Sequence, residues 1–248
     1  MTNFLELIIW EFEENWRLPY LEVITAVIVY FTLTNLPPFI ITPNTQLSLY
    51  FRTAYSFWLL LFQIIFVSVL FSRSFADQIE KREILTLFAH PIKRSTIFTA
   101  KFLTNTLIIF LIFAIPIFAQ GLLMNVSPLN PAHYISILTI FIPVLLYSAI
   151  ALACAVFTKS TWATVILPTV TLFALAFASP QYVSYNYLFT LTGMQTIFRY
   201  LAHAIIPDHL PLGQPTQQEF LGALLFPVIT SLILIAISFI YFRKMEVD

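Results

Sequence analysis

Long runs of apolar residues, separated by short polar stretches, dominate the chain. A helix needs about 20 mostly apolar residues to cross the hydrocarbon core of a bilayer. Six runs each predict a membrane-spanning helix: Leu18–Leu36, Tyr55–Phe71, Phe102–Met124, Tyr134–Phe157, Trp162–Ser179 and Leu221–Phe242. A further apolar stretch, Tyr187–Ile206, contains Arg199 and His203. We interpret it as an interfacial or re-entrant helix, with a full span as the alternative.

The composition agrees with a lipid environment. Hydrophobic residues make up 59% of the chain, charged residues only 10%, and the mean hydropathy is +0.88. A soluble domain has about 25% charged residues. The formal net charge is zero, so charge gives no reason to expect a nucleic-acid partner. The single cysteine, Cys154, excludes an intrachain disulfide. We therefore expect an all-α polytopic membrane protein with one transmembrane domain, residues 1–248.

The positions of Lys and Arg predict the orientation, because cytoplasmic loops carry an excess of both residues. Six spans place ten basic residues on the side that holds both termini: Arg17, Arg73, Lys81, Arg82, Lys93, Arg94, Lys101, Lys159, Arg243 and Lys244. The other side holds only Arg52 and Arg199. The sequence therefore predicts a multi-pass protein of the plasma membrane with both termini in the cytoplasm.

Residues 1–17 show the pattern of an amphipathic helix. The polar residues Asn3, Glu6, Glu13 and Arg17 are predicted to share one face, and Phe4, Leu5, Ile8, Phe12 and Trp16 the other. This pattern favours a helix that lies on the membrane surface. The alternative is an irregular extension of the first span.

The longest predicted cytoplasmic loop, residues 72–101, mixes charged and apolar residues. Asp77–Ala89 reads as a short amphipathic helix that Pro91 ends. A second helix is predicted to begin at Ser95, a natural N-cap, and to continue into the third span. The apolar side of the first helix comprises Ile79, Ile84, Leu85, Leu87 and Phe88. An exposed apolar side needs a cover, which lipid headgroups or a cytoplasmic partner would provide.

This loop and the end of the chain resemble permeases of the ABC-2 type. The matching residues are Glu80, Lys81, Arg82, Glu83, Leu85, Leu87, Pro91, Lys93, Arg94, Ile97 and Lys101, with the tail Phe242, Arg243 and Lys244. Length, span count and orientation also match. One departure is Ile84, because members of the family often have glycine after the last acidic residue.

The resemblance implies an ATP-driven exporter. Two permease subunits, identical or different, would form the translocation pathway, and two ATPase subunits would dock below them. Residues 1–17 would be the elbow helix, and residues 180–220 would contain short extracellular helices. The loop would hold the coupling helix, with Asp77, Glu80, Lys81, Arg82, Glu83, Leu85, Leu87, Phe88 and Pro91 contacting the ATPase. The chain has no phosphate-binding glycine-rich motif. ATP and Mg would therefore be bound by a separate ATPase, and we expect no catalytic activity and no cofactor in this chain itself.

Polar residues within spans often mark transport pathways. Glu22, Gln63, Thr164 and Thr169 are the candidates here. Each also has a structural interpretation: Glu22 reaches the membrane surface, Gln63 bonds a neighbouring helix, and the threonines bond backbone groups near Pro168.

Two other functions compete with the exporter. An ion-driven secondary transporter usually shows internal repeats, and none is visible here. An intramembrane metal-dependent enzyme would use His133, His203, Asp208 and His209 on the outer side. Their spacing is a weak metal-site signal, so we expect no metal. The sequence does not identify the transported substrate, and lipid, drug, peptide and polysaccharide are the alternatives.

Overall fold

The computed structural model describes residues 4–16, 19–34, 57–89, 92–178, 190–203 and 215–245. Every regular element in these ranges is helical. The elements are α1 (Phe4–Trp16), α2 (Pro19–Thr34), α4 (Phe57–Phe71), the π-helix η1 (Ser72–Asp77), α5 (Gln78–Glu80), α6 (Ile84–Ala89), α7 (Arg94–Leu123), α8 (Pro131–Thr158), α9 (Thr161–Ala178), α10 (Thr190–His203) and α11 (Gln217–Lys244). The expected all-α class is therefore confirmed for the described part of the chain.

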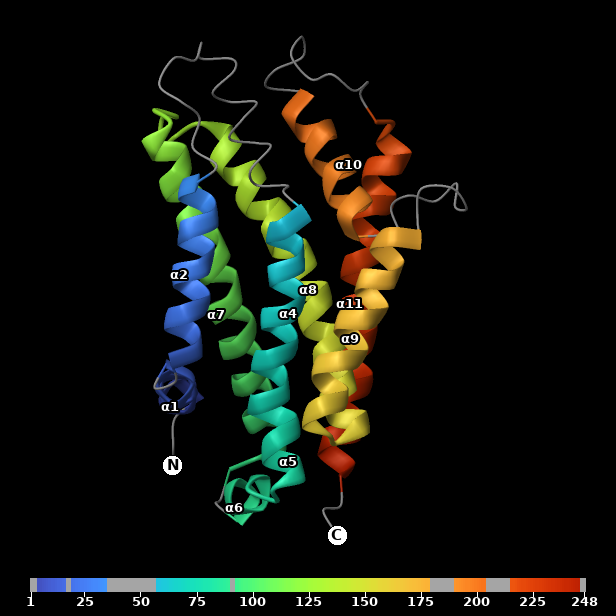
Figure 1. The fold of residues 1–248 in the computed structure, drawn as a ribbon. Coiled ribbons are helices and arrows are strands. Elements are labelled where there is room, and N and C mark those ends of the chain that lie inside the picture. The colour runs from blue at the N-terminus through green and yellow to red at the C-terminus, as the bar shows by residue number, and fades with distance from the viewer. Residues whose placement is uncertain are drawn as a thin grey trace.

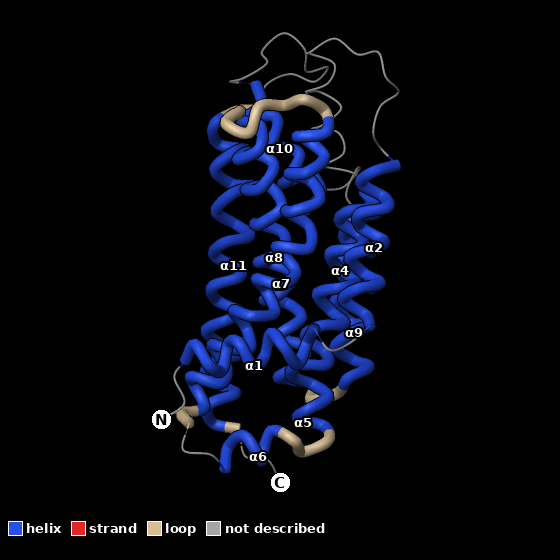
Figure 2. Tube along the Cα trace, turned by 90° about the vertical axis from the view of Figure 1, so that its left-hand side faces the viewer, coloured by secondary structure: helices blue, strands red, loops and turns tan. Residues whose placement is uncertain are grey.

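The long helices form an upright bundle in which successive helices run in opposite directions (Figure 1). The central helix is α8, which packs against α4, α7, α9, α10 and α11. We call the end that carries α1, α5, α6 and the last turn of α11 the basal end. Helix α1 lies across the bundle there, seen end-on in Figure 1 and from the side in Figure 2.

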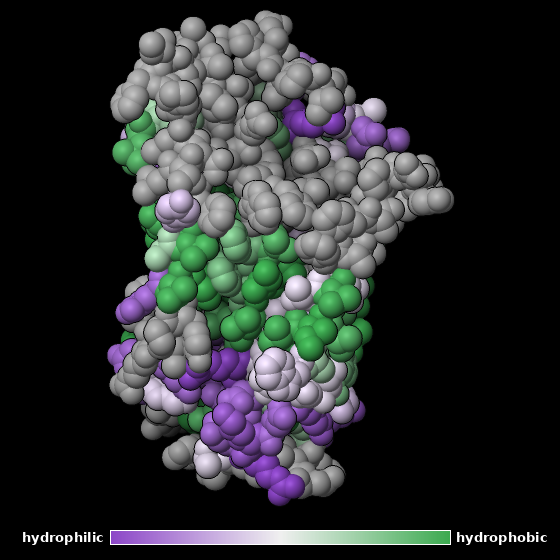
Figure 3. Space-filling model, viewed as in Figure 1, coloured by the Kyte–Doolittle hydropathy of each residue, from purple (hydrophilic) through white to green (hydrophobic). Residues whose placement is uncertain are grey.

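Three helices in the described ranges, α7, α8 and α11, are long and apolar enough to cross a membrane. Figure 3 shows apolar side chains across the middle of one face and hydrophilic side chains below them at the basal end. These features are those of a helical membrane protein. The helices of the other predicted spans, α2, α4 and α9, are shorter over their described residues.

Two helices differ in their bounds from the sequence expectation. Helix α7 begins at Arg94 after Lys93, which caps it without a side-chain hydrogen bond, so the predicted cap at Ser95 is wrong. Helix α10 has 14 residues and packs against α8 and α11. At 1.5 Å per residue its described part is about 21 Å long.

Side-chain caps fix the starts of two long helices. The Asn130 side chain accepts a hydrogen bond from the Ala132 backbone N–H, and Pro131 follows at the first helical position of α8. Thr216 and Glu219 form a reciprocal capping box at the start of α11. Such caps satisfy backbone N–H groups that have no partner within the helix.

Candidate functional site at the basal end

We call residues 72–93 the basal loop. The chain leaves α4 without a break, so that α4, η1 and α5 form one helical rod from Phe57 to Glu80. The rod ends at a turn, Lys81–Glu83, in which Arg82 has a φ of 60°. Few residues other than glycine adopt this left-handed conformation. Because the turn separates α5 from α6, the predicted continuous helix Asp77–Ala89 is wrong.

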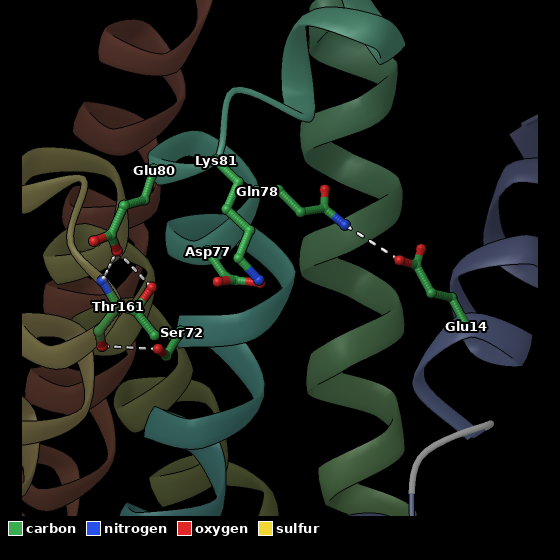
Figure 4. A network of polar contacts seen from close by, with 7 residues as sticks. All are labelled: Glu14, Ser72, Asp77, Gln78, Glu80, Lys81 and Thr161. Atoms are coloured by element: carbon green, nitrogen blue, oxygen red, sulfur yellow. Dashed lines mark hydrogen bonds and ion pairs between the residues drawn. The ribbon is translucent and has the colours of Figure 1, made fainter.

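The rod is bound to the start of α9 through one residue, Thr161 (Figure 4). Glu80 Oε2 accepts hydrogen bonds from the Thr161 backbone N–H at 2.8 Å and from its hydroxyl at 2.6 Å. On the inner side of the rod, Ser72 Oγ donates to the Thr161 carbonyl at 2.8 Å. The bonds from Thr161 lower the pKa of the Glu80 carboxyl. Glu80 thus caps α9, a helix that lies far from it in the sequence. We call the three hydrogen bonds that Glu80 and Ser72 form with Thr161 the Thr161 clasp.

Besides the hydrogen bonds to α9, one contact joins the rod to α1. Gln78 Nε2 lies 3.4 Å from Glu14 Oε1, and Figure 4 shows the two side chains pointing toward each other. Within the loop, Lys81 Nζ donates to Asp77 Oδ2 at 2.9 Å, and this bond raises the pKa of Lys81. Lys81 is largely exposed, so the pair orders the turn locally and contributes little to stability.

Aromatic contacts join the basal loop to the end of α11. The rings of Phe88 and Phe242 meet edge to face with centroids 5.7 Å apart. The Arg94 guanidinium lies 4.3 Å from the Phe88 ring centroid, and its Nη1 donates to the Met245 carbonyl at 2.7 Å. Phe242 is fully buried. The tail of the chain is therefore part of the basal site.

Part of the apolar side of the basal loop is covered by the chain itself. Ile79 and Ile84 are buried in the main core, and Leu87 packs against the smaller cluster that contains Leu7 and Ile97. Leu87 and Phe88 are half-buried. Among the described side chains of the loop, the exposed ones are polar: Glu80, Lys81, Arg82, Glu83, Thr86 and Lys93.

Helix α1 is fixed to α7 by polar contacts that sequence reasoning missed. The Lys101 ammonium forms a fully buried ion pair with Glu11, and Asn15 Nδ2 donates to Asn105 Oδ1 at 3.1 Å. Glu11 and Asn15 are four residues apart, as are Lys101 and Asn105, so both pairs lie one turn apart on facing helices. Burial raises the pKa of Glu11, and the Lys101 charge opposes that rise.

Helix α1 therefore has a third, buried face, whose residues belong to neither the predicted polar face nor the predicted apolar face. The buried residues are Leu7, Glu11 and Asn15, whereas the apolar Phe4, Leu5, Ile9, Trp10 and Phe12 are exposed. In the sequence, the two pairs are indicated by the four-residue step that Glu11–Asn15 and Lys101–Asn105 share. This signal is easily missed, because the charge of Lys101 assigns it to the cytoplasmic loop.

The structure also places the pathway candidates. Glu22 is exposed on α2, and Gln63 is fully buried on α4 with no hydrogen-bond partner for either amide atom. Thr164 and Thr169 each donate to the carbonyl four residues earlier, that of Ser160, just before α9, and that of Val165 within it. His133 is fully buried. The side chain of Leu85 and the residues Pro91, Asp208 and His209 lie outside the described part of the chain.

The chain matches no model of a known protein family and no curated protein.

Proposed function

We propose that the chain is the transmembrane permease subunit of an ATP-driven exporter of the ABC-2 type. In this proposal α2, α4, α7, α8, α9 and α11 cross the membrane, and the basal end is cytoplasmic. The distribution of charge supports this orientation: among the described residues, every Lys and Arg except Arg199 belongs to elements or turns at the basal end. Two permease subunits form the pathway, and separate ATPase subunits bind ATP and Mg.

One observation carries the proposal. An exposed charged turn, Glu80 to Glu83, lies at the tip of a helical rod that continues out of a bundle helix, α4. A turn that only connected two helices would need no such rod. A charged tip on a rigid rod suits a contact that receives force from a partner. Charged surfaces of this kind favour complementary charged partners and fast association.

The contacts of the basal loop suggest how such a force reaches the bundle. A push on the turn moves the rod along with α4, because the two are continuous. The Thr161 clasp carries α9 with them, since three hydrogen bonds converge on its first residue. The Phe88–Phe242 contact and the Gln78–Glu14 contact extend the movement to α11 and α1. We therefore propose that α4 and α9 move as a unit during the transport cycle.

The test is a detergent pull-down of the chain expressed with the genes that neighbour its own, followed by an ATPase assay. The wild-type chain should recover a separate ATP-hydrolysing subunit. Glu83→Lys places a cation on the turn and should weaken recovery roughly tenfold or more, because like charges across an interface cost several kcal/mol. Glu13→Lys is the matched control, since Glu13 is an exposed carboxylate on α1 and is not part of the turn.

The outcomes separate two parts of the proposal. A wild-type chain that recovers no ATPase refutes the exporter, and dependence of transport on an ion gradient would then favour a secondary transporter. Recovery that Glu83→Lys leaves unchanged refutes the docking role of the turn. Equal losses in Glu83→Lys and Glu13→Lys would show a general effect of charge at the basal end, which also counts against a specific contact.

A further inference from the structure

A groove runs between α2 and α4. Both helices pack against α7 but make few contacts with each other, and Figure 1 shows them side by side with α7 behind them. A partly open cavity of about 20 Å³ lies at this place, lined by residues of α2, α4 and α7. The enclosed part is therefore water-sized, and the cavity is partly open to the surface. This shape suits a flexible chain that lies along the surface better than a ligand that the protein encloses.

The walls of the groove are apolar. They include Leu21 and Ile24 of α2, Phe66 and Leu70 of α4, and Ile112 of α7. A water molecule between such walls would find almost no hydrogen-bond partner, and buried waters need two to four. A hydrocarbon chain can fill such a space without losing hydrogen bonds, because it makes none. In a membrane protein the nearest source of hydrocarbon is a lipid acyl chain.

The basal end of the groove is polar. Arg73 of η1 and Asn15 of α1 line the cavity there. Asn15 is held in place by its hydrogen bonds to the Asn105 side chain and the Glu11 carbonyl. The Glu11 carboxylate is paired with Lys101. Arg73 is half-buried, and its guanidinium carries five N–H donors, so it can keep a contact within the protein and still bind an anion.

These features together describe a site for an amphiphile with an anionic head. We propose that the groove binds an anionic phospholipid of the leaflet at the basal end, with one acyl chain between α2 and α4 and the phosphate at Arg73. Guanidinium groups bind phosphate oxygens in a bidentate manner. Arg73 and Asn15 belong to η1 and α1 at the basal end, where Figure 3 shows hydrophilic side chains below the apolar band. In the proposed position in the membrane, this boundary is the depth of lipid phosphates. This proposal does not depend on the exporter assignment.

Native mass spectrometry of the purified full-length chain tests the site. The chain is mixed with phosphatidylglycerol or with phosphatidylcholine that carries the same acyl chains, and the retained lipid is counted. We expect wild type to prefer phosphatidylglycerol by about fivefold, the effect of one basic residue near anionic lipid. Arg73→Gln should abolish the preference, and Arg73→Lys should keep part of it. Ile24→Trp fills the groove and should reduce retention of both lipids.

Arg243→Gln is the matched control, because Arg243 is an exposed cation at the same end and does not line the groove. An unchanged preference in Arg73→Gln, or an equal loss in Arg243→Gln, overturns the proposal. Displacement of the lipid by inorganic phosphate alone would also overturn it, because the site would then bind free anions. Unchanged retention in Ile24→Trp would refute the acyl-chain position, and this result does not depend on the folding of any Arg73 variant.

Discussion

The buried ion pair between Glu11 and Lys101 holds the N-terminal helix against the bundle, and its removal has a calculable effect. We consider Glu11→Met, Lys101→Met and the double substitution. Each single substitution leaves one charge that is buried and has lost its partner. The double substitution replaces both charges with apolar side chains of similar length. Both native side chains are almost completely inaccessible, so solvent cannot screen what remains.

The size of the effect follows from the contacts of α1. Breaking a buried pair costs about 3–5 kcal/mol, whereas replacing both partners by apolar residues is often neutral. Without the ion pair, α1 is held by burial of Leu7, about 1.5–3 kcal/mol. The Asn15–Asn105 and Gln78–Glu14 hydrogen bonds add about 1 kcal/mol each. The cost of one unpaired charge is therefore comparable to the remaining docking energy. We expect α1 to undock in either single variant while the bundle stays folded.

Hydrogen exchange of the full-length chain in detergent measures this directly. Amide exchange in Phe4–Trp16 should rise by roughly 200-fold to 5,000-fold in each single variant, which corresponds to about 3–5 kcal/mol. Exchange in α7 and α8 should stay slow. The double variant should recover most of the protection. Glu13→Met serves as the control, because Glu13 is exposed on the same helix.

Two results would refute the reasoning. Unchanged exchange in both single variants would mean that the pair does not hold α1, whatever its geometry. A double variant as unprotected as the singles would mean that the attraction between the charges, and not the cost of an unpaired charge, stabilises the helix.

Three further predictions concern other parts of the chain. Gln63→Leu removes a buried amide that has no hydrogen-bond partner and should stabilise the protein by about 1–3 kcal/mol. A lower melting temperature of the variant would instead show that the amide forms hydrogen bonds with a second subunit. Thr216→Ala breaks the capping box of α11 and should cost about 1 kcal/mol, with Thr216→Ser as the conservative control in thermal melts. The Glu80 pKa lies below 4.5, so the stability from the Thr161 clasp is complete above about pH 4.5 and is lost as the pH falls through the lowered value. Melting temperatures of wild type and Glu80→Gln should therefore differ at pH 7 and converge once the pH falls below the lowered pKa of Glu80, and a constant difference would contradict the clasp.

The helices were predictable from the sequence because their signal is local. An apolar run such as Tyr134–Phe157 has few alternatives to a helix buried in lipid or protein, and α8 extends it only slightly, to Pro131–Thr158. A helix within Tyr187–Ile206 was also predicted, and α10 lies there, from Thr190 to His203. These predictions depend on the composition of a window and need no knowledge of neighbours in space.

The contacts of the basal site could not be predicted in the same way. Glu80 and Thr161 are 81 residues apart, and Glu11 and Lys101 are 90 apart. A carboxylate in a loop looks identical in sequence whether it faces water or caps a distant helix. Hydropathy also gives no sign that Glu11 of α1 is buried, because it assumes that polar residues face water. Glu11 instead faces a buried cation.

The π-helix η1 shows why local propensity does not reveal the geometry of the rod. The sequence from Ser72 to Asp77 is ordinary for an α-helix, yet its residues adopt the wider π form. A π-turn holds one more residue than an α-turn and so rotates everything that follows it. On this rod Ser72 and Glu80 reach Thr161 of α9, while Gln78 reaches Glu14 of α1. With α-helical winding alone, the residues after η1 would be rotated relative to Ser72, and contacts to both neighbours at once would be harder to form. Because π-turns in α-helices frequently mark functional sites, the rotation of the rod supports a functional role for the basal loop that the residue types alone do not indicate.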